Sequence, residues 1–126
     1  MSAAPTRTCR QVTARVRAQR EYRPGFRRLD LAMPPEFETL VAGQFVQLLL
    51  EAPSPVLLPR PMSVASAQRR GGRLTVGFLY APVGAGTQAI AALDPGATVQ
   101  VLGPLGVGYP LETPGTPVLI AGGRGG

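Results

Sequence analysis

The 126-residue sequence contains no histidine, no lysine, no tryptophan and a single cysteine. Histidine is the usual general base near neutral pH, so its absence excludes a serine–histidine triad and a histidine-ligated metal site. The single cysteine, Cys9, excludes an internal disulfide and, within this chain, a zinc or iron–sulfur site with four thiolate ligands. Because no apolar leader precedes Cys9, we expect a cytoplasmic protein. No apolar run approaches the about 20 residues of a membrane span, and none is predicted.

The charge of the chain is strongly basic and is carried by arginine alone. Thirteen arginines against 7 acidic residues give a net charge of +6, which suits an anionic ligand and equally suits a solvated basic face. A basic β-barrel that binds nucleic acid is one alternative, but it needs aromatic side chains among the arginines for base stacking. The arginine-rich first quarter offers only Tyr22 and Phe26, since Phe45, Phe78 and Tyr80 fall in stretches expected to be buried. We therefore predict no nucleic-acid partner.

Glycine and proline are abundant, with 16 and 14 residues, while 44% of the chain is hydrophobic. This combination is typical of a single all-β domain with many short strands joined by turns. Alternating polarity and turn residues predict strands at residues 11–19, 28–33, 43–50, 60–67, 74–80 and 98–102. The first two strands are expected to pair, Gly71 and Gly72 to form a hairpin turn, and Gly77 to mark a bulge or a close backbone approach.

Within the first predicted strand, two sets of side chains alternate. Val12, Val16 and Ala18 are expected to face the core, whereas Arg17 and Gln19 are expected to face the solvent. Residues 1–9, which precede this strand, are expected to be disordered.

The stretch around Arg60 is stiff because Pro59 and Pro61 flank the arginine. Pro61 also favours an extended conformation for Arg60, so its guanidinium is expected to project from a strand edge. We expect the hydroxyl of Ser63 on the same side, an arrangement suited to a phosphate with a polar heterocycle beside it. The alternative is an edge strand whose arginine is only solvated.

A short helix is predicted after a flexible turn at residues 82–86. Thr87 is a favourable N-cap residue, and residues 88–93 can form a helix that ends at Pro95 and Gly96. The unpaired amides of its first turn would favour an anion by about 0.3–1 kcal/mol, and glycine lets a phosphate approach the backbone. A capped connector helix without a ligand is the alternative.

The last quarter of the chain changes character. Residues 103–110 predict a loop shaped to meet a ligand or another subunit, or else a pair of turns. Residues 113–117 are expected to be a linker, and residues 118–121 a buried strand of a parallel sheet. Residues 122–126 resemble the beginning of a phosphate-binding turn. We therefore expect residues 113–126 to be a linker and the stub of a second, α/β domain.

Five motifs occur in the order and spacing of one protein family: residues 43–45, 60–63, 79–87, 103–110 and 118–123. Over residues 12–126 the chain resembles the FAD-binding barrel of the ferredoxin-NADP reductase superfamily. Within that superfamily it is most similar to the electron-transfer subunits of dihydroorotate dehydrogenase. The resemblance implies a six-stranded antiparallel Greek-key barrel with one short helix over residues 10–112, followed by the first strand of a nicotinamide-binding α/β domain.

The resemblance also implies a non-covalent FAD site. Arg60 would pair with the pyrophosphate, Ser63 and its strand neighbours would lie against the isoalloxazine ring, and Gly86 with Thr87 would cap the pyrophosphate. The residues assigned to the cofactor in this way are Arg60, Pro61, Met62, Ser63, Leu79, Tyr80, Ala81, Gly86 and Thr87. No catalytic side chain and no metal ligand is predicted.

Complete members of this family pass electrons between NADH, FAD and a [2Fe-2S] cluster, and onward to a catalytic dihydroorotate dehydrogenase subunit of pyrimidine biosynthesis. The resemblance implies that this chain holds only the FAD, is not a complete catalyst alone, and forms a hetero-oligomer with that subunit. A related flavin reductase or hydrogenase-associated subunit stays open as an alternative. Three departures from the family pattern stand out. Ala81 and Pro82 replace a frequent basic residue, Arg124 replaces a small residue in the glycine turn, and the nicotinamide domain with its cysteine cluster is expected to be missing from this chain.

Overall fold

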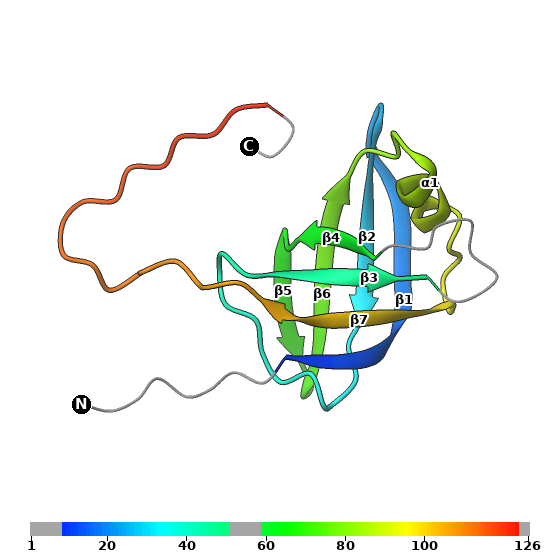
Figure 1. The fold of residues 1–126 in the computed structure, drawn as a ribbon, viewed down its shortest axis with the longest axis horizontal. Helices are drawn as coiled ribbons and strands as arrows, with labels where there is room; N and C mark the ends of the chain where they lie inside the picture. The colour runs from blue at the N-terminus through cyan, green and yellow to red at the C-terminus, as the bar shows by residue number, and fades with distance from the viewer. Residues whose placement is uncertain (1–8, 51–58, 124–126) are drawn as a thin grey trace.

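A computed structural model describes residues 9–50 and 59–123, which form seven strands and one short helix. The elements are β1 (Arg10–Arg23), β2 (Phe26–Ala32), β3 (Phe45–Leu49), β4 (Arg60–Ser63), β5 (Ser66–Arg70), β6 (Arg73–Tyr80), α1 (Ala85–Ala91) and β7 (Thr98–Leu105). Figure 1 shows the strands curving around one core, with α1 at one end of β1 and β2.

All seven strands belong to one antiparallel sheet in the order β4-β3-β7-β1-β2-β6-β5. The two strands at the ends of this order, β4 and β5, are consecutive in the chain and are joined by Val64 and Ala65 alone. The N–H of Ala65 donates to the carbonyl of Gly77 at 2.8 Å and fixes this bend. The two ends of the sheet therefore meet at this bend, and the strands form a barrel in which β4 and β5 are joined by the chain and not by strand pairing.

The predicted all-β antiparallel fold is confirmed, and the difference in strand number has a simple cause. The single strand expected at residues 60–67 turns sharply at Val64 and Ala65 and is divided into β4 and β5. In the sheet, β2 neighbours β6 and not β3, the next strand in the chain. Going around the barrel from β2, the strands are β6, then β5 with β4, then β3. This arrangement is a Greek key.

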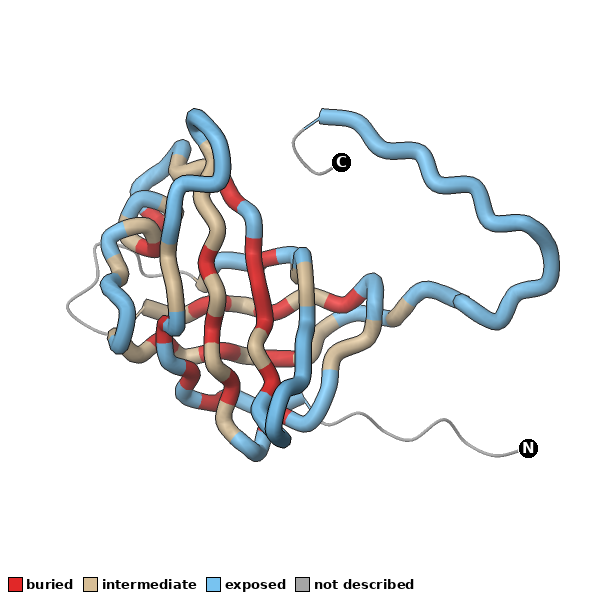
Figure 2. Tube along the Cα trace, turned by 180° about the vertical axis from the view of Figure 1, so that it is seen from behind, coloured by how far each residue is buried: buried red, intermediate tan, exposed pale blue. Residues whose placement is uncertain are grey.

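The core consists mainly of the inward-facing side chains of the barrel strands, to which α1 adds Ile90 and the loop after β2 adds Met33 and Phe37. Figure 2 shows buried positions alternating with exposed ones along the strands. Each large branched or aromatic side chain buried in this way contributes about 1.5–3 kcal/mol relative to exposure. The largest fully buried side chains are Phe78, Leu29, Leu31, Leu48, Ile90, Val16, Val46, Val76, Val99 and Val101.

The hairpin predicted at Gly71 and Gly72 is confirmed. Both residues have positive φ angles, 57° and 78°, and Arg70 pairs with Arg73 across the turn. The pairing of the first two strands is also confirmed, with a two-residue connection at Pro24 and Gly25. These turns were predictable because positive φ angles favour glycine.

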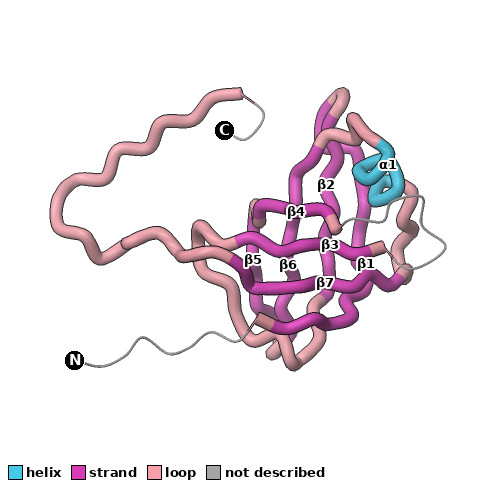
Figure 3. The backbone as a smooth tube through the Cα atoms, in the orientation of Figure 1, coloured by secondary structure: helices cyan, strands magenta, loops and turns pink. Residues whose placement is uncertain are grey.

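Two expectations about the chain after α1 are corrected. Strand β7 continues to Leu105 rather than ending at residue 102, because Leu105 pairs with Phe45 of β3. The strand expected at residues 118–121 is not formed, and the whole segment is exposed (Figure 3). Figure 1 shows this segment leading away from the barrel, where no other described strand can pair with it.

Some expectations fall outside the described residues. These are the disorder expected for residues 1–8 and the position of Arg124 in the glycine turn. Cys9 is described and is an exposed free thiol. No helix in the described ranges is long and apolar enough to cross a lipid bilayer.

Candidate cofactor-binding site

Arg60 opens β4 and lies against the first turn of α1. A Cβ atom placed on Gly86 would collide with the Nε atom of Arg60 and would lie 2.9 Å from its Cζ and 3.0 Å from its Cδ. The guanidinium group therefore crosses directly over the buried Gly86. Two predicted site residues that are far apart in the sequence are thus brought together, and any larger residue at position 86 would displace the arginine.

The beginning of α1 differs from the sequence-based prediction. The N-cap is Gly84, with φ −139° and ψ 176°, and Thr87 is the third helical residue rather than the N-cap. The hydroxyl of Thr87 accepts the N–H of Gly84 at 3.1 Å and donates to the carbonyl of Gly84 at 3.1 Å. The prediction of Thr87 as N-cap was wrong because its hydroxyl caps the helix from inside the first turn.

This cap decides which groups at the helix start can meet a ligand. The Thr87 hydroxyl is engaged by Gly84, so its contribution to a ligand would come from the backbone. The first-turn amides of Ala85, Gly86 and Thr87 have no partner within the helix. Backbone N–H groups and the guanidinium of Arg60 therefore face the same region.

Ser63 closes β4 and lines a separate hollow of about 470 Å³. Pro61 and Tyr109 line the same hollow, but Arg60 does not. Side chains three residues apart point to opposite faces of a regular strand, so the expectation of Arg60 and Ser63 on one side was wrong. The structure instead places the arginine at one end of β4 and the serine hydroxyl at the other.

Met62 and Tyr80 both point into the barrel. Each is only 7% exposed and belongs to the hydrophobic core. A cofactor on the outside of the barrel could therefore meet these two residues mainly through their backbone. Leu79, by contrast, is 42% exposed, and Ala81 is half-buried.

The hydroxyl of Tyr80 is used inside the protein. It donates to Oε1 of Gln19 at 2.6 Å, and Nε2 of Gln19 donates to the carbonyls of Ile90 and Leu93 at 2.9 and 3.1 Å. Gln19 thus ties the end of α1 to both β1 and β6. Burial raises the pKa of the Tyr80 hydroxyl, although a hydrogen bond and the charge of Arg27 partly counteract this rise.

Sequence reasoning missed Gln19, which was assigned to the solvent face of the first strand. The strand contains a register shift between Val16 and Ala18, and beyond it Gln19 lies opposite the buried Leu29. The alternating polarity of the sequence does not reveal such a register shift, so it could not predict the direction of the Gln19 side chain. Only the pairing with β2 shows that Gln19 points inward.

The donors present fit a dinucleotide cofactor. A diphosphate requires cationic and N–H donors, and Arg60 with the first turn of α1 provides both. The hollow beside Ser63 provides a hydroxyl next to the exposed ring of Tyr109. Among residues 9–50 and 59–123, no group of three or more metal-ligating side chains occurs.

Comparison with known proteins shows the family of the chain. A family model described as the oxidoreductase FAD-binding domain matches residues 13–109. The electron transfer subunit of dihydroorotate dehydrogenase B (NAD(+)) from Bacillus caldolyticus is 42% identical over 83 residues, which cover 64% of this chain and 32% of that protein. The corresponding subunit from Geobacillus kaustophilus is 41% identical over 86 residues, which cover 66% of this chain and 33% of that protein. The chain thus spans about a third of the length of these curated relatives.

Solved structures share the fold. The cytochrome P450 reductase GcoB of Amycolatopsis is 27% identical, with a TM-score of 0.63 over 83% of this chain and 31% of that chain. The ferredoxin reductase of carbazole 1,9a-dioxygenase is 22% identical, with a TM-score of 0.63 over 81% of this chain and 30% of that chain. The second likeness concerns the fold alone.

Proposed function

Because the chain belongs to the oxidoreductase FAD-binding domain family, we propose that it holds the diphosphate of FAD between Arg60 and the first turn of α1. The observation that carries this proposal is the position of the Arg60 guanidinium across Gly86. The arginine supplies charge-assisted hydrogen bonds, and the amides of Gly86 and Thr87 supply N–H donors. The absence of a side chain at position 86 lets both groups reach one ligand.

The isoalloxazine ring is proposed to occupy the hollow beside Ser63, with Pro61 and the backbone of Met62 along its edge. A strand rises about 3.3 Å per residue, so β4 separates the two binding regions by about 10 Å. Leu79, Tyr80 and Ala81 would border the cofactor mainly through backbone groups. When bound, the flavin supplies the redox chemistry, and the side chains of this chain bind and orient it.

An FAD titration of the chain and three variants tests these assignments. Arg60→Ala should weaken FAD binding about ten- to a hundredfold, since a charge-assisted hydrogen bond contributes about 1.5–3 kcal/mol. Ser63→Ala removes a neutral hydrogen bond of about 0.5–1.5 kcal/mol and should weaken binding about two- to tenfold. Arg10→Ala, an exposed arginine at the start of β1, is the control for the loss of charge. Equal affinity in all four proteins would contradict the assigned site.

For the whole protein, we propose a role in passing electrons from NADH to a catalytic dihydroorotate dehydrogenase subunit in pyrimidine biosynthesis. The support is the 42% and 41% identity to subunits of that name, against 27% to the cytochrome P450 reductase GcoB. A related flavin reductase or hydrogenase-associated subunit with another electron acceptor is the alternative. Co-purification with a catalytic dihydroorotate dehydrogenase subunit separates these two candidates, and retention of another oxidoreductase instead would favour the second.

We further propose that residues 113–123 lead into a nicotinamide-binding domain. Val118, Leu119 and Ile120 are 80, 96 and 94% exposed, which is costly for an apolar triplet unless other strands cover it. Adding the part of the Bacillus caldolyticus subunit beyond the matched region, as a separate polypeptide, should slow amide hydrogen exchange at residues 118–121. Unchanged exchange in the mixture would argue against this arrangement.

A cytoplasmic location is also proposed. The support is that Cys9 is an exposed free thiol, and thiols remain reduced in the cytoplasm. Fractionation of cells that express the protein, followed by immunodetection, should find it with cytoplasmic markers. Recovery in an exported fraction would be inconsistent with this location.

A further inference from the structure

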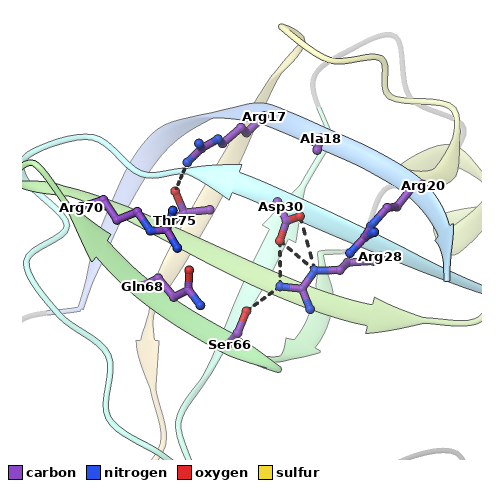
Figure 4. Close-up of a pocket in the computed structure, with 9 residues that line it drawn as sticks. All are labelled: Arg17, Ala18, Arg20, Arg28, Asp30, Ser66, Gln68, Arg70 and Thr75. Carbon is purple, nitrogen blue, oxygen red and sulfur yellow. Dashed lines mark hydrogen bonds and ion pairs between the residues drawn. The ribbon is translucent and has the colours of Figure 1, made fainter.

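A second hollow, of about 300 Å³, lies on the outer face of the barrel over strands β1, β2, β6 and β5. Figure 4 shows arginines entering it from strands on two sides, with an acidic residue between them. The residues of this basic hollow that matter here are Arg17, Arg20, Arg28, Asp30, Arg70 and Thr75. None of them belongs to the proposed FAD site.

The floor of the basic hollow is a fixed ion pair. Nη2 of Arg28 lies 3.0 Å from Oδ1 of Asp30 and donates to Oγ of Ser66 at 2.7 Å. This group rests on Gly77, where an added Cβ would collide with Arg28 and lie 2.5 Å from the Ser66 hydroxyl and 2.8 Å from the Asp30 carboxylate. Gly77 was expected to mark a bulge or a close backbone approach; the described pairing has no register shift there, and the close neighbours are side chains. Asp30 is neutralised by Arg28 and does not neutralise the other arginines.

The remaining cations of the basic hollow have no acidic partner in the described parts of the chain. Nη1 of Arg17 donates to the neutral hydroxyl of Thr75 at 3.0 Å, and Figure 4 shows Arg70 reaching toward the same threonine. With four arginines and one aspartate, the lining has a net charge of 4 − 1 = +3. An excess of positive charge therefore converges on one hollow.

Arginines also face one another directly across the strands. Arg20 lies opposite Arg28 in the pairing of β1 with β2, and Arg70 lies opposite Arg73 in the pairing of β5 with β6. Like charges directly opposite each other destabilise a sheet. Arg73 does not line the basic hollow, but an anion bound beside Arg20 and Arg28 would reduce the repulsion within that pair, so the basic hollow favours a multivalent anion over an empty site.

We propose that the basic hollow binds a small phosphate-bearing anion of the diphosphate class. A diphosphate carries two to three negative charges, which matches the excess of three positive charges. Its several oxygens can accept hydrogen bonds from Arg17 on one side and Arg70 on the other, in the geometry that guanidinium groups favour. The volume of about 300 Å³ corresponds to about ten water molecules and leaves room for the group that carries the phosphates.

A nucleic acid fits the basic hollow less well. None of the lining residues is aromatic, so no base could stack there. The hollow is also concave and lined by polar groups, whereas the centre of a protein–protein interface is depleted of charge. The lining therefore favours a small anion over a macromolecule.

The test is a calorimetric titration of the chain with inorganic pyrophosphate at constant ionic strength and with excess FAD present. Arg17→Gln and Arg70→Gln should each weaken pyrophosphate binding by about tenfold or more and leave FAD affinity unchanged. Arg10→Gln removes one charge outside the basic hollow and should have little effect. Asp30→Asn removes the only acidic group of the lining and should strengthen binding, an effect that partial unfolding cannot produce.

The same titration with Arg60→Ala separates the basic hollow from the FAD site. Pyrophosphate binding that survives Arg60→Ala supports a second site, even if FAD binds elsewhere. Loss of pyrophosphate binding in Arg60→Ala or in the presence of FAD would overturn the proposal, since the anion would then occupy the cofactor site. Equal weakening by Arg10→Gln and Arg17→Gln would overturn it too, because only the total charge would matter.

Discussion

Replacing Gly86 by alanine should weaken FAD binding without destabilising the protein. The new methyl group would occupy the space of the Arg60 side chain, whose Nε, Cζ and Cδ atoms lie within 3.0 Å of the added Cβ. Arg60 is exposed and flexible, so it can swing away at little cost. Swinging away removes the guanidinium from the region that the first-turn amides of α1 also face.

The two expected effects have opposite signs. Gly86 has no positive φ angle and is the second residue of α1, and alanine is favoured over glycine by about 0.8–1 kcal/mol in a helix interior, which is the upper limit for this position. The free energy of unfolding should therefore stay the same or rise by up to about 1 kcal/mol. The loss of the Arg60 contact costs about 1.5–3 kcal/mol of binding, which is about ten- to a hundredfold in the dissociation constant.

A double-mutant cycle measures whether the methyl group acts through Arg60. FAD affinity is measured by flavin fluorescence for the unchanged chain, Gly86→Ala, Arg60→Ala and the double variant, with urea unfolding of each. In a chain that already carries Arg60→Ala, the added Gly86→Ala change should weaken FAD binding little further, since the two changes remove the same contact. Gly84→Ala is the matched control, because a Cβ at Gly84 meets nothing within 4 Å.

Two results would refute this reasoning. One is a Gly86→Ala variant that binds FAD as tightly as the unchanged chain while Arg60→Ala binds weakly. The other is additive losses in the double variant, which would mean that the arginine and the helix start contact different ligands or different parts of the protein.

Three further variants test side-chain contacts of the barrel strands. Gln19→Leu should lower the free energy of unfolding by about 1–3 kcal/mol in urea titrations, since it removes the side-chain partner of the Leu93 carbonyl and of the Tyr80 hydroxyl and one of the donors to the Ile90 carbonyl. Gly77→Ala should cost about 1–3 kcal/mol in the same assay, because the ion pair of Arg28 and Asp30 occupies the space of the methyl group. Burial raises the pKa of Tyr80 above 10.0, so its contribution to stability is complete below pH 10.0 and declines above it. Tyr80→Phe should remove this part of the alkaline decline, as unfolding curves between about pH 9 and 11 would show.

The parts of the fold that were predictable depend on local rules. The alternation in β6 and the glycine pair of its hairpin determine strand and turn without reference to the rest of the chain. Gly77 was noticed because a glycine inside a strand implies a close neighbour, but the neighbours themselves come from β2 and β5. The sequence identified the position, and only the sheet pairing identified what fills it.

The candidate site was predictable in part, for the same reason. Arg60 and Gly86 were both named from their local motifs, and the structure brings them together. Thr87 was assigned to the wrong cap position because a threonine can cap a helix either from the N-cap position or from inside the first turn. Ser63 was expected on the same side as Arg60, although side chains three residues apart in a strand point to opposite faces. The structure separates the two residues.

A single irregularity in β1 explains both the missed glutamine and the basic hollow. Val16 lies opposite Leu31 and Ala18 lies opposite Asp30, so Arg17 is the extra residue of a bulge. Before the bulge the even-numbered residues point inward, and after it the odd-numbered ones do, which turns Gln19 toward α1. The same reversal leaves Ala18 and Arg20 on the outer face, where they line the basic hollow with Arg17. Without the bulge, the Gln19 side chain would point away from α1 and could not bind its carbonyl, and the Arg20 side chain would point away from the basic hollow. One inserted residue therefore supports both the anchoring of α1 and the proposed anion site.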